Sequence, residues 1–195
     1  MHRVSLATAS VLMLFVTIVM SASVDAALTT DAIRCQKAIG HETARYAQRI
    51  HSETVQCNND LVQGRSCNTA ARDAAIARAL SALNRTLLLK CFGIPLEALG
   101  FPGSCSGPDG GVFTPSNLVS CITDAVQSQV DMAVVVEYPD LQTLSDAGAH
   151  CQSTIGGEGR LFMSRKERAR NRCLNRQLRN PSSVDCRAEV PPGTG

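Results

Sequence analysis

Cysteine is the residue type in this sequence that offers the widest range of chemistry, and 9 of the 195 residues are cysteines. Thiols can form disulfides, bind metals or act as nucleophiles, and their spacing helps to distinguish these chemistries. No Cys-x2-Cys pair occurs, and the histidines show no ligand spacing: His2, His41, His51 and His150. His41 and His51 are expected to face solvent. The cysteines therefore predict disulfides rather than a metal site.

Two other patterns could support catalysis, but each has a simpler interpretation. Ile155-Gly156-Gly157-Glu158-Gly159 lacks the Lys-Ser/Thr of a phosphate-binding loop, so we expect it to be a loop that precedes a helix. Asp124, Asp131 and Glu137 lie along one expected helix, where acids most often occupy a solvated face. No Gly-x-Ser-x-Gly elbow occurs either. We predict no catalytic residues and favour a protein that is not an enzyme.

A basic segment near the C-terminal end could bind polyanions. The chain as a whole has a net charge of only +2, but residues 160–179 contain a single acid, Glu167. The candidate anion-binding residues are Arg165, Lys166, Arg168, Arg170, Arg172 and Arg176. Nucleic acid or an anionic envelope component is the candidate partner, because arginine forks fit phosphate groups. The simpler interpretation is a solvated helix that packs through Leu161, Phe162, Ala169, Cys173 and Leu178.

The N-terminal residues have the parts of a cleaved signal peptide. Arg3 supplies positive charge, residues 11–20 are apolar, and Val24-Asp25-Ala26 offers small residues before a cleavage site. The apolar run is about ten residues, shorter than the ~20 that span a bilayer. We therefore expect a signal peptide over 1–26, no transmembrane segment after its removal, and a secreted or periplasmic location.

Apolar residues at helical spacing predict an all-α fold. One helix is expected over 30–57, with Thr30 as its N-cap, and a second over 69–91 after a turn at 58–66. A third is expected over 115–137, since Thr114-Pro115 is a favourable start. Its expected core face consists of Leu118, Ile122, Ala125, Met132 and Val136.

The lengths of the first two helices restrict the disulfide pairing. A continuous helix from Cys35 to Cys57 would be about 33 Å long, and one from Cys67 to Cys91 about 36 Å. Bonded cysteines need Cα atoms within ~7 Å of each other. A short connection makes the two helices antiparallel. The expected bridges are therefore Cys35–Cys91 and Cys57–Cys67, which staple a helical hairpin at both ends.

A later segment repeats the start of this hairpin. Cys35-Gln36-Lys37-Ala38-Ile39-Gly40 is similar to Cys151-Gln152-Ser153-Thr154-Ile155-Gly156, and Cys57 and Cys173 follow at the same interval. By analogy, Cys173 is expected to pair with Cys186. The prediction is one six-cysteine helical unit over 27–141, a shortened copy with a basic face over 142–188, and a disordered tail over 189–195.

Three cysteines remain outside this analogy. Cys105 and Cys121 pair by elimination. Cys151 has no counterpart of Cys91, so it is expected to be unpaired, to exchange with Cys105 or Cys121, or to link two chains as a disulfide dimer. His150 adjoins Cys151, but neighbouring side chains point apart on a helix, which makes a nucleophile–base pair a weak candidate.

These motifs resemble those of uncharacterised cysteine-rich, helical secreted proteins of bacteria, which are built from repeats. The matching residues are Cys35-Gln36-Lys37-Ala38-Ile39, Tyr46, Cys57, Leu99-Gly100-Phe101-Pro102 and Cys121-Ile122. The resemblance implies no activity, cofactor or catalytic residue. The further cysteine that the family pattern has soon after Cys121 is absent, which leaves the Cys105–Cys121 pairing open. We expect an exported, disulfide-stabilised helical protein with a structural or binding role, and polyanion binding through 160–179 as the alternative.

Overall fold

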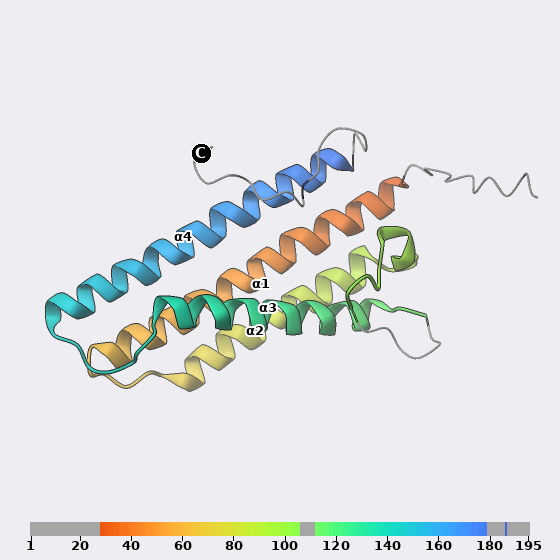
Figure 1. Cartoon of the computed structure of the whole chain (residues 1–195). Coiled ribbons are helices and arrows are strands. Elements are labelled where there is room, and N and C mark those ends of the chain that lie inside the picture. The colour runs from red at the N-terminus through yellow and green to blue at the C-terminus, as the bar shows by residue number, and fades with distance from the viewer. Residues whose placement is uncertain (1–27, 106–111, 179–185, 187–195) are drawn as a thin grey trace, which may run out of the picture.

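The computed structural model of the chain describes residues 28–105, 112–178 and Cys186 (Figure 1). Its elements are α1 (Thr30–Val62), α2 (Thr69–Lys90), the short 3-10 helix η1 (Leu96–Leu99), α3 (Pro115–Glu137) and α4 (Asp146–Gln177). These described ranges contain no β-strand, so the predicted all-α class is confirmed. The expected signal peptide at 1–26 and tail at 189–195 lie outside the described residues.

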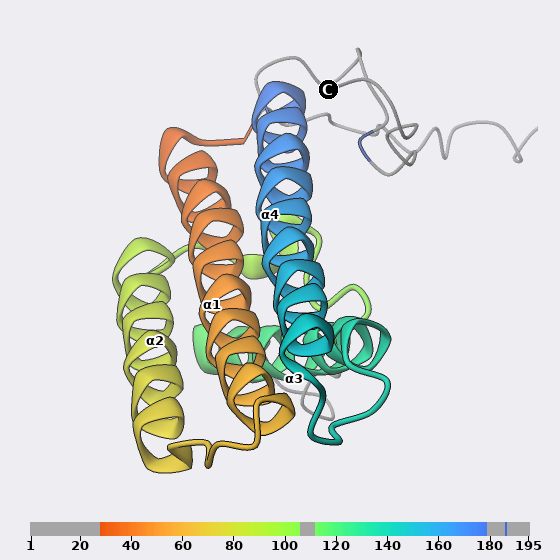
Figure 2. The same cartoon turned by 90° about the vertical axis from the view of Figure 1, so that its left-hand side faces the viewer.

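Helix α1 is the centre of the fold. Figure 2 shows α2 and α4 on either side of it, while α3 crosses the layer that these three helices form. Because neighbours cover α1 from several directions, its buried residues extend beyond a single stripe. They include Ile39, Tyr46, Ile50, Val55 and Val62.

The ends of α1 differ from the sequence prediction. Its N-cap is Thr29, whose side chain accepts a hydrogen bond from the backbone of Ala32 at 3.1 Å, rather than Thr30. The helix continues to Val62, whereas a turn was expected from Asn58 onward. Asn58 and Val62 are both buried. Tertiary packing therefore keeps asparagine, a weak helix former, in helical conformation.

The bounds of α3 agree with the prediction, but its buried face does not. Thr114 caps the helix and Pro115 opens it, as expected. The buried residues are Leu118, Ile122, Val126, Val130 and Val134. Ala125, Met132 and Val136 were expected in the core, and all three are exposed. The second half of α3 has apolar residues of its own on all sides, so periodicity alone could not show which face packs on α1.

Four disulfides connect the elements. Their Cα–Cα distances are 4.8 Å for Cys35–Cys91, 4.9 Å for Cys57–Cys67, 5.5 Å for Cys105–Cys121 and 5.7 Å for Cys173–Cys186. Cys35–Cys91, Cys57–Cys67 and Cys173–Cys186 are the pairs expected from the sequence, and Cys105–Cys121 is the pair that the sequence left open. The first two lie at opposite ends of α1 and α2, which consequently run antiparallel.

The glycine-rich segment 155–159 lies inside α4, so the expected loop is wrong. Helical glycine costs about 1 kcal/mol relative to alanine, and close packing offsets this. A methyl group on Gly156 would lie 2.9 Å from Cγ1 of Val55 and 3.0 Å from Cζ of Tyr138. A methyl group on Gly159 would lie 2.6 Å from Cδ of Glu137. These two glycines let α4 approach α1 and the end of α3.

Candidate functional site: an arginine-lined groove beside α4

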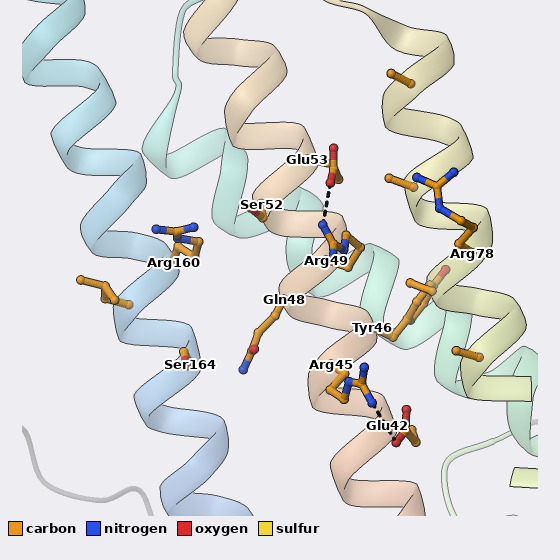
Figure 3. Close-up of a pocket in the computed structure, with 15 residues that line it drawn as sticks. Glu42, Arg45, Tyr46, Gln48, Arg49, Ser52, Glu53, Arg78, Arg160 and Ser164 are labelled. Carbon is orange, nitrogen blue, oxygen red and sulfur yellow. Dashed lines mark hydrogen bonds and ion pairs between the residues drawn. The ribbon is translucent and has the colours of Figure 1, made fainter. Parts of the chain in front are cut away.

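A groove of about 860 Å³ runs along α1 between α2 and α4, and arginines from all three helices line it (Figure 3). Arg45 and Arg49 belong to α1, Arg78 to α2 and Arg160 to α4. We call these four residues the groove arginines. Gln48, Ser52 and Ser164 add polar groups to the lining.

The groove exists because α2 presents small side chains to it. The α2 wall consists of Ala71, Ala75, Ala79 and Ala82, together with Arg78. Their spacing of three or four residues keeps the alanines on one side of the helix. A methyl group reaches only a short way toward α4, so the space above α1 stays open.

The groove has an excess of positive charge. Arg49 Nη1 lies 3.0 Å from Oε1 of Glu53, and Arg45 Nη1 lies 3.6 Å from Oε1 of Glu42. Among the residues that the structure describes, Arg78 and Arg160 form no ion pair. Two glutamates therefore face four arginines, and two of the guanidinium groups retain their full capacity to bind an anion.

Tyr46 lies at the α2 side of the groove (Figure 3). Burial raises its pKa above the usual value of 10.0, and the negative charge of Asp124 adds to this, while a hydrogen bond with Thr123 acts in the opposite direction. The tyrosine hydroxyl therefore stays protonated and neutral at physiological pH, and it adds no negative charge to the groove.

The predicted anion-binding residues of α4 are all exposed, but they do not share one face. Arg165, Arg168, Arg172 and Arg176 recur at intervals of three or four and form one stripe. Lys166 and Arg170 lie about 120° away from this stripe around the helix axis. Arg168 connects the stripe to the groove, because its Nη2 donates to Oγ of Ser164 at 2.9 Å.

The simpler interpretation of this segment fails in part. Leu161 and Phe162 were expected to pack into the protein, yet both are exposed, and so is Ala169. Leu178 and Cys173 are half-buried. The side of α4 that contacts α1 is instead formed by residues such as Gly156 and Asn171, whose Nδ2 donates to the carbonyl of Gly40 at 3.0 Å.

His51 is fully buried, so the expectation that it faces solvent is wrong. Its Nε2 lies 2.9 Å from both carboxylate oxygens of Glu137, which also leaves the expected solvated face. Nδ1 of His51 has no hydrogen-bond partner. Neither residue lines the arginine groove. The pair connects α1 to the end of α3 and has no access to a substrate through that groove.

The other catalytic candidates remain separate. Asp124 and Asp131 are exposed, as expected, and so is His41. Cys151 is a free, exposed thiol at the start of α4. In the described ranges no cluster of His, Cys, Asp or Glu side chains could hold a metal ion. Of the helices in the same ranges, none is long and apolar enough to cross a membrane.

Sequence reasoning missed three of the groove arginines, namely Arg45, Arg49 and Arg78. The signal was weak: two arginines four residues apart on one helix, and an arginine among alanines on the next. Only the packing of α2 and α4 on α1 places them around a common space.

Comparisons of the chain with protein-family models, with curated proteins and with solved structures give no match. The function must therefore be inferred from the geometry of the site.

Proposed function

We propose that this is an exported, disulfide-stabilised protein that binds a linear polyanion along the arginine groove and the adjoining stripe of α4. The observation that carries the proposal is the position of Arg78 and Arg160. They come from helices on opposite sides of α1, line one groove, and have no acidic partner among the described residues.

The shape and charge of the site favour a linear anion. The groove is open to solvent and lies along α1, so an extended chain can lie in it. Arg168 beside Ser164, followed by Arg172 and Arg176, extends the positive charge for about 16 Å along α4 from Arg165. Guanidinium groups bind phosphate and sulfate through two parallel hydrogen bonds, so both kinds of polymer are suitable ligands.

Export is supported by the disulfides. Eight of the nine cysteines are bonded in the structure, and structural disulfides persist in oxidising compartments. The apolar run at 11–20 with the small residues Val24 and Ala26 adds the pattern of a cleaved signal. A secreted or periplasmic location is part of the proposal.

The test compares two double variants with the same loss of charge. Arg160→Gln with Arg168→Gln removes cations from the groove side of α4, whereas Lys166→Gln with Arg170→Gln removes them elsewhere on the same helix. Binding of the mature protein to a labelled heparin oligosaccharide is measured by anisotropy over a salt series. Vesicles that contain anionic phospholipid form a second arm, which distinguishes a polymer from a membrane surface.

We expect wild-type affinity to fall steeply with salt, because binding releases counterions. The groove variant should lower the slope of log affinity against log salt by about two, which is one per lost contact. The control variant should change it little. Equal losses in both variants, or retention that ignores salt, would reject the groove as the binding site.

A further inference from the structure

Helices α1 and α4 contact each other through corresponding residues of the sequence repeat. Gly40 of α1 packs against Asn171 of α4, and Gly156 of α4 packs against Val55 of α1. The interval from Gly40 to Gly156 is also the interval from Val55 to Asn171 and from Cys35 to Cys151. The two contacts are therefore the same contact made twice, as a local two-fold axis between antiparallel helices requires.

The same correspondence matches Ile39 with Ile155 and Tyr46 with Phe162. In α1 these positions are covered: Ile39 is 7% exposed and Tyr46 is 3% exposed. In α4 they are open, since Ile155 is 47% exposed and Phe162 is 65% exposed. We call Cys151, Ile155 and Phe162 the open face of α4.

The structure also shows what covers this face in α1. Helix α2 lies antiparallel on it, and Cys91, directly after the last residue of α2, bonds to Cys35. Thr123 of α3 adds a hydrogen bond with Tyr46. Leu83 and Leu87 of α2 are fully buried in the core that this packing creates. In the described ranges, α4 contacts α1 and the end of α3, and neither of them covers Ile155 or Phe162.

We infer that the open face of α4 docks an amphipathic helix of a partner protein, in the way that α2 docks on α1. The partner helix runs antiparallel to α4, and a cysteine at its C-terminal end bonds to Cys151. Its C-terminal half is apolar, to cover Ile155 and Phe162. Its N-terminal half is acidic, because in the antiparallel arrangement this half lies opposite Arg165 and Arg172, which are on the same side of α4 as the open face. This inference goes beyond the proposed function and does not rest on it, although the two ligands would share Arg165 and Arg172.

A second copy of this chain fits the open face poorly. Cys151, Ile155, Phe162, Arg165 and Arg172 are separated by four, seven, three and seven residues, so they fit the seam of a parallel helix pair, in which Glu158 and Ala169 fill the two positions between them. In a parallel homodimer linked through Cys151, each seam residue meets its own copy. Arginines would then oppose arginines, which is unfavourable. Charge complementarity thus favours an acidic partner helix.

The covalent step is an ordinary thiol oxidation. The Cys151 thiol and the partner thiol each lose one proton and one electron, and a sulfur–sulfur bond forms between them. The two electrons and two protons reduce one disulfide of an oxidant such as oxidised glutathione to two thiols. An oxidising compartment of the kind that the disulfides favour supplies such an oxidant.

The test uses the mature full-length protein and a synthetic peptide of residues 69–91, whose only cysteine is Cys91. A second peptide carries Arg72→Glu and Arg78→Glu, which make its N-terminal half acidic. Each peptide is incubated with the protein in a glutathione redox buffer, and the mixed disulfide at Cys151 is quantified by peptide mass spectrometry. The protein variants are Ile155→Ser with Phe162→Ser, and the control Met132→Ser with Val136→Ser, which alters exposed apolar residues of α3.

We expect the acidic peptide to accumulate on Cys151 to a greater extent than the native-sequence peptide. The Ile155→Ser, Phe162→Ser protein should lower this accumulation about tenfold or more, because the buried apolar contacts are lost. The α3 control should match wild type. Equal bonding by the open-face variant would show a reactive thiol without a docking face. A Cys151–Cys151 dimer as the main product would assign the face to a second copy. Either result overturns the inference.

Discussion

Two neighbouring glycines of α4 should respond in opposite ways to the same substitution. A methyl group on Gly157 meets nothing within 4 Å, whereas one on Gly156 would lie 2.9 Å from Val55 and 3.0 Å from the ring of Tyr138. Alanine in place of helical glycine contributes about 1 kcal/mol through propensity at either position. The difference between the two variants therefore isolates the steric term.

Overpacking a tight interface typically costs about 1–3 kcal/mol. Gly157→Ala should raise the free energy of unfolding by up to ~1 kcal/mol, and Gly156→Ala should lie about 1–3 kcal/mol below it. For a chain of this size, each kcal/mol corresponds to roughly 2–4 °C in Tm. Thermal and guanidinium unfolding of the oxidised mature protein, followed by circular dichroism, measures both. If Gly156→Ala is as stable as Gly157→Ala, then α4 does not approach α1 as closely as described.

The remaining predictions concern a tyrosine and two disulfides. Burial, followed by the adjacent negative charge of Glu137, raises the pKa of Tyr138 to about 12. Because the pKa of Tyr138 is higher in the folded protein than the unfolded value of 10.0, the stability that this tyrosine contributes is fully present below pH 10 and is lost as the pH rises toward 12. Tyr138→Phe should therefore flatten the decline of Tm at alkaline pH. Replacing both cysteines of Cys35–Cys91 by serine should lower the unfolding free energy by about 4 kcal/mol, against about 3 for Cys57–Cys67. The reason is that the first bridge closes a separation of 56 residues and the second of 10; equal losses in urea titrations would contradict this chain-entropy account.

Helix positions and cysteine pairing were accessible from sequence because both depend on linear geometry. The rise per residue of a helix and the short connection between the two helices fix which cysteines can meet, so Cys35–Cys91 and Cys57–Cys67 could be predicted. The start of α3 followed similarly, since a threonine before a proline satisfies local backbone groups at Thr114.

Features that depend on which helices pack against each other could not be predicted from the sequence. His51 was expected to face solvent, but the end of α3 places the Glu137 carboxylate 2.9 Å from its Nε2. The glycines of α4 suggested a loop, and the close approach of Val55 and Tyr138 explains why a helix keeps Gly156.

The sequence by itself determined that this chain forms helices joined by particular disulfides, because propensity, capping and spacing act over short distances along the chain. The tertiary structure alone decided that Arg49, Arg78 and Arg160 share one groove and that Phe162 stays uncovered while Tyr46 is buried. The physical reason is that burial and proximity depend on the packing of helices that are distant in sequence.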